Sequence, residues 1–423
     1  MVKPGYKQTE IGQIPTDWDI VPLLDKAELL NGLTYTPNNI HEHGLLVMRS
    51  SNVQNGRFTF DDNVYVDCEV DDTKLIRSGD ILICVRNGSA ALIGKCAKAD
   101  RDYRATFGAF MAVLRGTDNE YIIHLLQQGA IQRHIAKNSD STINQITNAD
   151  FRQIVIPFPK RKTERMTISA ILSDVDVLIS NLEKLIVKKK AIKQGTMQEL
   201  LTGKRRLSGF DSEWRTHKFG DIFDILPNNA FTRAEMSVTG IVKNIHYGDI
   251  LTKYPEYICA ESDEIPFIES GVDLSRFSEK CYVKSGDVII ADTAEDETVG
   301  KATEIIKVDC LILSGQHTLL CRPKITFAER FLGYYLNAAC YHDQLIPYIT
   351  GTKVSSISRA SITQTILRVP ENREQAAIAD ILTDMGNEIK ELEQKLAKYR
   401  LVKQGMMSEL LTGRIRLTEK EDA

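Results

Sequence analysis

A segment of about 45 residues occurs twice in this chain of 423 residues, and the two copies start 210 residues apart. The first copy covers residues 163–207 and the second covers residues 373–417. Roughly 20 of the 45 aligned pairs are identical, and both copies contain the motif Glu-Leu-Leu-Thr-Gly. Two copies are too few for a solenoid of stacked repeats. The sequence therefore predicts a duplicated chain, in which each half is a globular region followed by the repeated segment.

Both copies have the apolar spacing of a long helix. Apolar residues alternate steps of three and four, which gives the narrow seam of a coiled coil rather than the wide face of a core-covering helix. The glycines that follow, Gly203 and Gly413, suit the left-handed conformation that ends a helix. Only the other copy offers a matching seam, so we expect the two helices to pair antiparallel. The pairing residues are predicted to be Ile168, Leu172, Val175, Ile179, Leu182, Ile186, Ile378, Leu382, Met385, Ile389, Leu392 and Leu396.

The stretches that precede the helices have mixed character. They contain short apolar runs separated by Gly, Asn and Asp, which is typical of short strands and turns. A weaker repeat links them, because Ser78-Gly79-Asp80 and Ser285-Gly286-Asp287 both precede an apolar run. We predict an α+β fold with pseudo-two-fold duplication. Its four parts are a first mixed domain (1–162), a first helix (163–207), a second mixed domain (208–372) and a second helix with a tail (373–423).

Composition restricts the classes of function that the chain can have. Lys and Arg total 53 against 57 Asp and Glu, for a net charge of −4, so any basic face is local. No apolar run approaches the roughly 18 residues that span a bilayer, and the first residues lack the apolar segment of a signal peptide. We therefore expect a cytoplasmic protein without membrane contact. The eight cysteines form no C-x-x-C pair, and His41 and His43 lack a third ligand, so we expect no metal site.

Motifs of catalysis are missing. The sequence has no glycine-rich cofactor turn, no Walker pair, no adenine-methylation loop and no deaminase pattern. We therefore expect a binding protein without chemistry of its own. Two alternatives stay open: an enzyme with unfamiliar motifs, and a coiled-coil scaffold whose two modules do not bind DNA.

Polar residues on loops after the apolar runs are candidates for DNA contact, because base edges are read by Arg, Lys, Asn, Gln, Ser and Thr side chains. The first domain offers Arg49, Ser51, Asn52, Arg86, Asn87, Lys95, Thr142, Asn144 and Gln145. The second domain offers Lys243, Asn244, His246, Lys301, His317, Thr352, Lys353, Ser355 and Ser356. A polar turn after a strand is common and accounts for any one of them taken singly, so the prediction of DNA contact rests on the loops as a set.

The predicted pairing of the helices also bears on DNA recognition. An antiparallel pairing of the helices would give the chain a two-fold axis, and two-fold proteins read paired half-sites. Because the two domains have diverged, those half-sites should differ.

Several marks together resemble the specificity (S) subunits of type I restriction-modification systems. They are the two Leu-Leu-Thr-Gly helices, the opening Tyr6–Trp18, the Ser-Gly-Asp motifs and the segment Gly351–Ser358 before the last apolar run. The similarity covers essentially the whole chain. It implies that each domain reads one half of a bipartite, asymmetric site in double-stranded DNA. It also implies that the helices set the spacing and dock two methyltransferase (M) subunits.

The same resemblance assigns the chemistry to partners. Restriction (R) subunits would join the complex to make an ATP-dependent endonuclease. S-adenosylmethionine, ATP and magnesium would then belong to the M and R subunits, and this chain would bind no cofactor.

Overall fold

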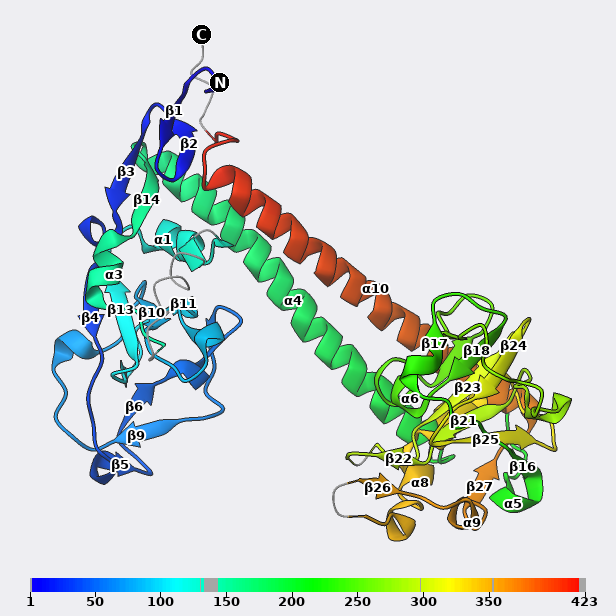
Figure 1. Cartoon of the computed structure of the whole chain (residues 1–423). Helices are drawn as coiled ribbons and strands as arrows, with labels where there is room; N and C mark the ends of the chain where they lie inside the picture. Colours follow the sequence, from blue (N-terminus) through cyan, green and yellow to red (C-terminus); the bar gives the residue numbers. More distant parts are fainter. Residues whose placement is uncertain (1, 130, 133–143, 297, 352–353, 418–423) are drawn as a thin grey trace. The chain divides into compact units, whose positions relative to one another are not determined.

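The computed structural model describes residues 2–129, 131–132, 144–296, 298–351 and 354–417. The chain forms two compact units. Unit 1 is Met1–Glu183 together with Gln394–Ala423, and unit 2 is Lys184–Glu393. These units cut across the four predicted parts, because each long helix contributes one half to each unit (Figure 1).

The two long helices are α4 (Lys162–Leu200) and α10 (Asn372–Leu410), and each has 39 residues. In unit 1, Asp176 and Glu183 of α4 form ion pairs with Lys403 (2.6 Å) and Arg400 (2.7 Å) of α10. Residue numbers thus rise along one helix and fall along the other. In unit 2, Lys189 of α4 lies 2.6 Å from Glu388 of α10, and Arg206, just beyond α4, lies 2.7 Å from Glu374 near the start of α10. The helices pair antiparallel in both units, as predicted.

Apolar burial follows the seam that the sequence indicates. Nine of its twelve residues are buried, and Val175, Met385 and Leu392 are half-buried. Toward the helix ends, the seam also packs against the mixed domains. Ile168 and Leu172 belong to the core of the first domain, and Ile378 and Leu382 belong to that of the second.

Each mixed domain contains two small sheets. In the first domain, an antiparallel sheet has the strand order β11-β10-β13-β4, and a second sheet has the order β12-β6-β9-β5 with β12 parallel to β6. Their bounds are β4 Glu28–Asn31, β5 Ile40–His41, β6 Leu45–Met48, β9 Val64–Val66, β10 Ile81–Cys84, β11 Cys96–Lys98, β12 Ala105–Phe107 and β13 Met111–Arg115. Helices α1 (Asn119–Leu126) and α3 (Asn148–Gln153) follow.

The second domain repeats this plan. Its sheets have the orders β16-β25-β21-β23-β19 and β17-β20-β18-β24, with β24 parallel to β18. The bounds are β16 Phe223–Leu226, β17 Met236–Ser237, β18 Val242–Ile245, β19 Tyr257–Cys259, β20 Phe267–Ile268, β21 Val288–Ala291, β23 Ala302–Ile306, β24 Leu311–Ser314 and β25 Thr318–Pro323. Short helices α6 (Tyr247–Thr252), α7 (Phe331–Leu336), α8 (Ala339–His342) and α9 (Arg359–Ile362) flank the sheets. The predicted α+β class is thereby confirmed.

Smaller strand pairs complete the units. In unit 1, β3 (Trp18–Pro22) pairs with β14 (Val155–Pro159), and β1 (Tyr6–Thr9) pairs with β2 (Gly12–Pro15). In unit 2, β15 (Arg215–Lys218) pairs with β27 (Ile366–Val369), and β22 (Thr293–Ala294) pairs with β26 (Ser355–Ser356).

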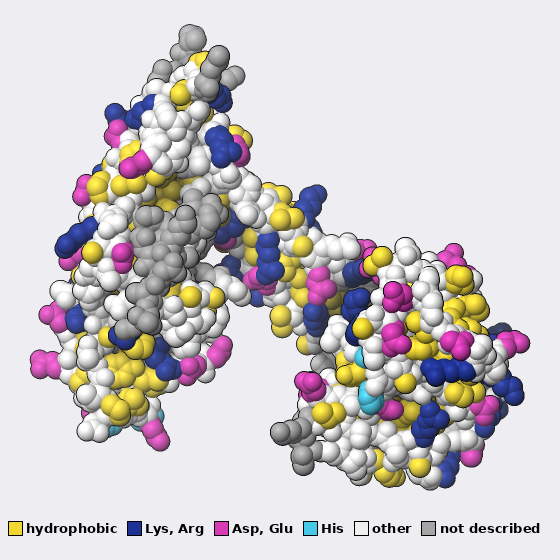
Figure 2. Space-filling view, viewed as in Figure 1, with side chains coloured by type: hydrophobic (Ala, Val, Ile, Leu, Met, Phe, Trp, Pro, Cys, Tyr) yellow, Lys and Arg dark blue, Asp and Glu magenta, His cyan; other side chains and the backbone are white. Residues whose placement is uncertain are grey.

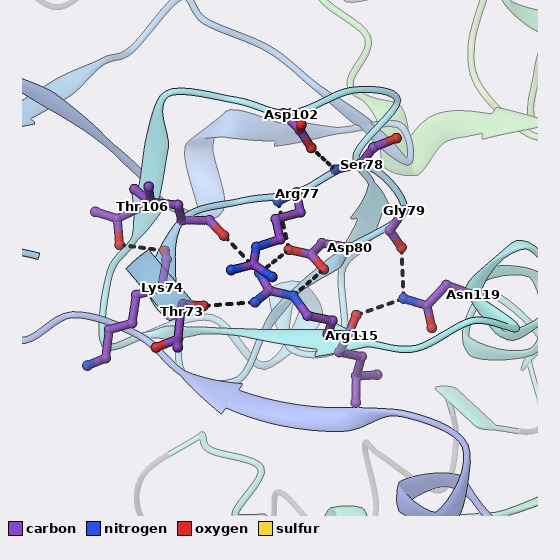
Figure 3. A network of polar contacts seen from close by, with 12 residues as sticks. Thr73, Lys74, Arg77, Ser78, Gly79, Asp80, Asp102, Thr106, Arg115 and Asn119 are labelled. Carbon is purple, nitrogen blue, oxygen red and sulfur yellow. Dashed lines mark hydrogen bonds and ion pairs between the residues drawn. The ribbon is translucent and has the colours of Figure 1, made fainter. Parts of the chain in front are cut away.

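The repeated Ser-Gly-Asp motif forms a buried anchor in each domain, and Figure 3 shows that of the first domain. Asp80 is 2% exposed and accepts hydrogen bonds from the Arg115 guanidinium at 2.8 and 2.6 Å and from the Arg77 amide at 2.8 Å. In the second domain, Asp287 accepts the same set from Arg322 and Lys284. The motif therefore fixes the turn before β10 to the neighbouring strand β13, and the turn before β21 to β25. Its role is structural.

A second repeated contact closes each unit, and we call it the clamp. In unit 1, the buried carboxylate of Glu164 accepts hydrogen bonds from Trp18 Nε1 (3.2 Å) and from Arg416 (2.7 and 3.0 Å). In unit 2, Glu374 accepts them from Trp214 Nε1 (3.2 Å) and Arg206 (2.7 and 2.8 Å). Each clamp joins the start of one long helix, the end of the other and one mixed domain.

Candidate nucleic-acid interface

Three predicted segments of the first domain come together at one end of its sheets. The Asn87 amide group donates to the Ser50 hydroxyl at 3.1 Å, which joins the loops after β10 and β6. The Asn87 backbone N–H donates to the Asn144 carbonyl at 3.2 Å, and the Asn144 side chain donates to the Gly88 carbonyl at 3.0 Å. Arg86 also forms an antiparallel bridge with Gln145. Loops that are far apart in the sequence thus share one surface.

A cavity of about 590 Å³ opens beside these loops. Its lining includes Tyr35, Ile40, Arg49, Ser51 and Phe110. Phe110 is 56% exposed, and the Arg86 guanidinium lies 5.1 Å from the centre of its ring. Figure 2 shows apolar side chains gathered near β6 and β9 on this domain. An exposed aromatic ring beside a guanidinium offers a base both an apolar and a charged contact.

The second domain brings its corresponding loops together in the same way. Thr293 Oγ1 lies 3.3 Å from His317 Nδ1, and Thr293 pairs with Ser356 across β22 and β26. The ring of Tyr247 meets the His317 ring edge to face at 5.3 Å. A cavity of about 730 Å³ lies beside them, lined by polar residues that include Asn228, Arg276, Gln316, His317 and Arg359.

Two predicted contacts are fold residues instead. Asn52 and Asn244 have no exposed surface. The side-chain oxygen Oδ1 of Asn52 accepts from the Arg49 backbone N–H at 2.9 Å, and Oδ1 of Asn244 accepts from the Asn229 side-chain amide at 2.8 Å. A fully buried side chain cannot reach a base edge, so the prediction of DNA contact is wrong for these two asparagines in this conformation.

Three predicted lysines are engaged inside the domains. Lys95 Nζ donates to the Ser50 carbonyl (3.4 Å), Lys243 Nζ to the Ala260 carbonyl (3.0 Å) and Lys301 Nζ to the Leu251 carbonyl (3.1 Å). Burial lowers the pKa of Lys301. These amines hold loops in place, and each would have to give up a bond within the fold to contact a phosphate.

His246 serves as the N-cap of α6. It is 8% exposed, and its Nδ1 accepts from the Gly248 backbone N–H at 3.2 Å. Burial, together with the nearby Arg233 charge, lowers its pKa, so the ring is neutral at pH 7. Ser355 is half-buried in β26, where it pairs with Ala294 of β22. Thr142, Thr352 and Lys353 lie outside the described residues.

Sequence reasoning missed Phe110, Asn228, Arg276 and Arg359. Phe110 was missed because only polar residue types were considered, although continuing the Ser-Gly-Asp alignment by the same 207 residues pairs it with His317. Arg359 lies 3.4 Å from the Asn228 side-chain oxygen, and Arg276 stacks over Phe277 at 5.0 Å. No local motif marks these last three, since distant parts of the chain bring them together.

Comparisons with known proteins place this arrangement in a family. The model of the type I restriction modification DNA specificity domain matches residues 15–194 and again residues 211–398. The chain belongs to this family. The resemblance drawn from the sequence is confirmed, and the two matches coincide with the duplication.

The relatives are specificity subunits. The putative type I restriction enzyme MjaX specificity subunit of Methanocaldococcus jannaschii is 27% identical over 98% of this chain and 97% of the relative. The EcoKI specificity subunit of Escherichia coli and the StySPI specificity subunit of Salmonella potsdam are each 28% identical. The chain spans 44% of the length of each of those two.

Solved structures share the fold. The type I restriction-modification S subunit from M. genitalium has a TM-score of 0.56 at 14% identity, covering 93% of this chain and 96% of that one. A chain from a structure of type I system assembly and conformational transition has a TM-score of 0.54 at 16% identity, covering 95% and 99%. Within the described residues, no helix is long and apolar enough to cross a membrane.

Proposed function

We propose that this chain is the DNA sequence-specificity subunit of a type I restriction-modification complex, and that each mixed domain reads one half of a bipartite, asymmetric double-stranded site. One observation carries this proposal. Both domains use the same strand frame to gather loops at one place, and the side chains on those loops differ between the domains. Two half-sites of different sequence require this combination of the same strand arrangement and different side chains on the loops.

The candidate contacts are the exposed and half-exposed residues of these loops. In the first domain they are Arg49, Ser51, Arg86, Asn87, Phe110, Asn144 and Gln145. In the second domain they are Arg276, Thr293, Gln316, His317, Ser355, Ser356 and Arg359. Lys95 and Lys301 lie at the edge of these surfaces and are candidates for phosphate contact. The net charge of −4 leaves a large share of phosphate neutralisation to partner subunits.

The paired helices are proposed to dock two M subunits. Both helices carry large apolar side chains that the chain itself leaves exposed, including Val187 (67%) on α4 and Leu401 (69%) on α10. Exposed apolar residues on an otherwise charged helix are suited to contact with another protein. The R subunits, the methyl donor, ATP and magnesium would then complete the complex through the partners, in the cytoplasm, while this chain supplies recognition alone.

Mapping methylated adenines tests the whole proposal. The chain is expressed with its M partners, and genomic methylation is sequenced with and without it. A split motif should appear only with the chain, and replacing residues 208–372 by another such domain should change one half of that motif. Methyl transfer by the purified chain alone would favour an enzyme, and methylation that is indifferent to the chain would refute recognition.

Helix length tests the spacing role separately. Seven residues inserted into α4 and seven into α10, at paired positions, keep the seam in phase and lengthen each helix by about 10 Å. At about 3.4 Å per base pair, the gap in the motif should grow by about three base pairs, and the bases read should stay the same. Seven residues inserted at Gly209, in the segment between α4 and β15, serve as the matched control and should leave the gap unchanged.

Docking is tested by Val187→Asn and Leu401→Asn. Each should weaken co-purification with the M subunit, because each places a polar group in the proposed apolar contact. Ile346→Asn changes another exposed apolar residue (56%), which lies in the second domain, and should not weaken co-purification. Equal loss in all three variants would contradict docking on the helices.

A further inference from the structure

The turn between two successive strands, β12 and β13 in the first domain and β24 and β25 in the second, makes equivalent backbone hydrogen bonds in the two domains. It is Gly108–Met111 in the first and Gly315–Thr318 in the second, again 207 residues apart. The Gly108 N–H donates to the Met48 carbonyl at 3.0 Å, and the Gly315 N–H donates to the Ile245 carbonyl at 2.8 Å. In both cases the acceptor belongs to the strand that pairs parallel with the strand before the turn, β6 with β12 and β18 with β24.

The residue at the tip of this turn is held by a second equivalent bond. The Phe110 carbonyl accepts from the Val85 N–H at 3.0 Å, and the His317 carbonyl accepts from the Asp292 N–H at 3.1 Å. Val85 follows β10 and Asp292 follows β21, and they too are 207 residues apart. Two sheets therefore fix the backbone of each tip, so that its side chain is presented by a rigid frame.

Each tip side chain has a partner at a third equivalent position. Arg86 lies over the Phe110 ring at 5.1 Å, and Thr293 lies 3.3 Å from His317. Both partners are bridged to the last loop of their domain, Arg86 to Gln145 and Thr293 to Ser356. The positions match, whereas the chemistry does not: a guanidinium on a phenyl ring corresponds to a hydroxyl beside an imidazole.

Both tips border a cavity. Phe110 lines the cavity of the first domain, and His317 lines that of the second. Phe110 is 56% exposed, and the His317 side chain is 46% exposed. His317 also has a left-handed backbone (φ 56°), a conformation that costs a non-glycine residue energy and clusters at functional positions. These side chains extend from a backbone held by hydrogen bonds, are open to a ligand and differ between the domains.

From this geometry we infer that Arg86–Phe110 and Thr293–His317 are equivalent specificity-determining pairs, each reading the same step of its own half-site. The inference rests on the proposed function. Arg86 supplies the forked donor that pairs with guanine O6 and N7, and Phe110 supplies an apolar face for the methyl group of a neighbouring thymine. Thr293 and His317 each offer one hydrogen-bonding group and select no guanine in this way.

Exchanging the pair tests the inference. The variant Arg86→Thr/Phe110→His is produced in complex with the M subunits, and the methylated motif is determined by sequencing. We expect one step of the first half-site to change, with the preference for guanine there falling about 10- to 100-fold, while the second half-site stays the same. The matched control is Arg101→Thr/Phe60→His, which makes the same replacements in a second arginine–aromatic group of this domain, around Tyr103 and outside the cavity. Its motif should be that of the unchanged chain.

A single substitution covers the case in which the double variant fails to fold. Arg86→Lys keeps the charge and removes the forked donor, so it should lose guanine preference at one step and retain DNA affinity. An unchanged motif in a folded, active double variant, or in Arg86→Lys, overturns the inference and leaves the proposed function intact. Absence of any motif with the unchanged chain would refute the proposed function instead.

Discussion

The clamp of unit 1 offers a sharp test of how the chain is held together. Glu164 is 1% exposed in its side chain and depends on Arg416 for its opposite charge. Replacing Arg416 by Met removes both of its hydrogen bonds to this buried carboxylate and keeps the bond from the Trp18 Nε1–H. Removal of one partner of a buried ion pair costs about 3–5 kcal/mol. Because Arg416 is 26% exposed, water can replace part of the interaction, and we expect about 3 kcal/mol, the lower end of that range.

The second step of the test removes the stranded charge. Glu164→Gln/Arg416→Met keeps an oxygen that accepts the Trp18 Nε1–H and leaves no ion to bury, so the double variant should recover most of the lost stability. Arg414→Met is the matched control, because Arg414 pairs with Glu409 at the surface (57% and 36% exposed) two residues away. Surface pairs contribute about 0–1 kcal/mol.

Hydrogen exchange resolves the two units within one chain, which a single unfolding transition would not. A loss of about 3 kcal/mol corresponds to amide exchange roughly 150-fold faster in β10 and β13 of unit 1, at about 1.4 kcal/mol per tenfold. Exchange in β21 and β25 of unit 2 should not change. The clamp does not stabilise unit 1 if amide exchange in Arg416→Met is no faster than in Arg414→Met. The same conclusion follows if the double variant is as unstable as Arg416→Met.

Three further predictions concern pH and packing. Burial raises the pKa of Glu304 to about 7, so the folded state keeps a proton that the unfolded state loses, and the stability of unit 2 should fall by up to about 3 kcal/mol between about pH 4.5 and 7. Glu304→Gln should reduce this dependence of stability on pH when unfolding is measured at pH 5 and 8. Burial lowers the pKa of His124 to about 4, so the stability of unit 1 should instead fall by up to about 3 kcal/mol as the pH falls from about 6.5 to 4. His124→Gln should reduce this pH dependence in unfolding experiments over the same pH range. Leu382→Ala empties a fully buried site where α10 meets the second domain and should cost about 2–5 kcal/mol in denaturant unfolding, whereas Leu401→Ala, at a site 69% exposed, should cost less than about 0.5 kcal/mol.

The sequence was most informative where a pattern repeats. The long helices and their seam were readable because apolar spacing and duplication agree, and the paired Ser-Gly-Asp motifs mark equivalent strands. The functions of single polar residues were not readable. Asn52 and Arg49 stand three residues apart on one loop, yet Asn52 is buried as a turn cap and Arg49 lines a cavity. The two side chains differ in burial because different parts of the fold pack against them, and this tertiary packing is not visible in the local sequence.

The duplication separates the residues that give stability from those that give specificity. Asp80 with Arg115 and Asp287 with Arg322 keep the same buried contacts in both domains, because a change in either partner would strand a charge. The backbone carbonyls of Phe110 and His317 hold these tips to the frame, and this bond does not depend on which side chain each tip carries. A frame of this kind allows one domain to acquire a new base preference while the anchor, the clamp and the other domain stay as they are. Asp80→Asn should therefore lower the stability of unit 1, and Phe110→His should alter the DNA sequence that it selects at little cost in stability.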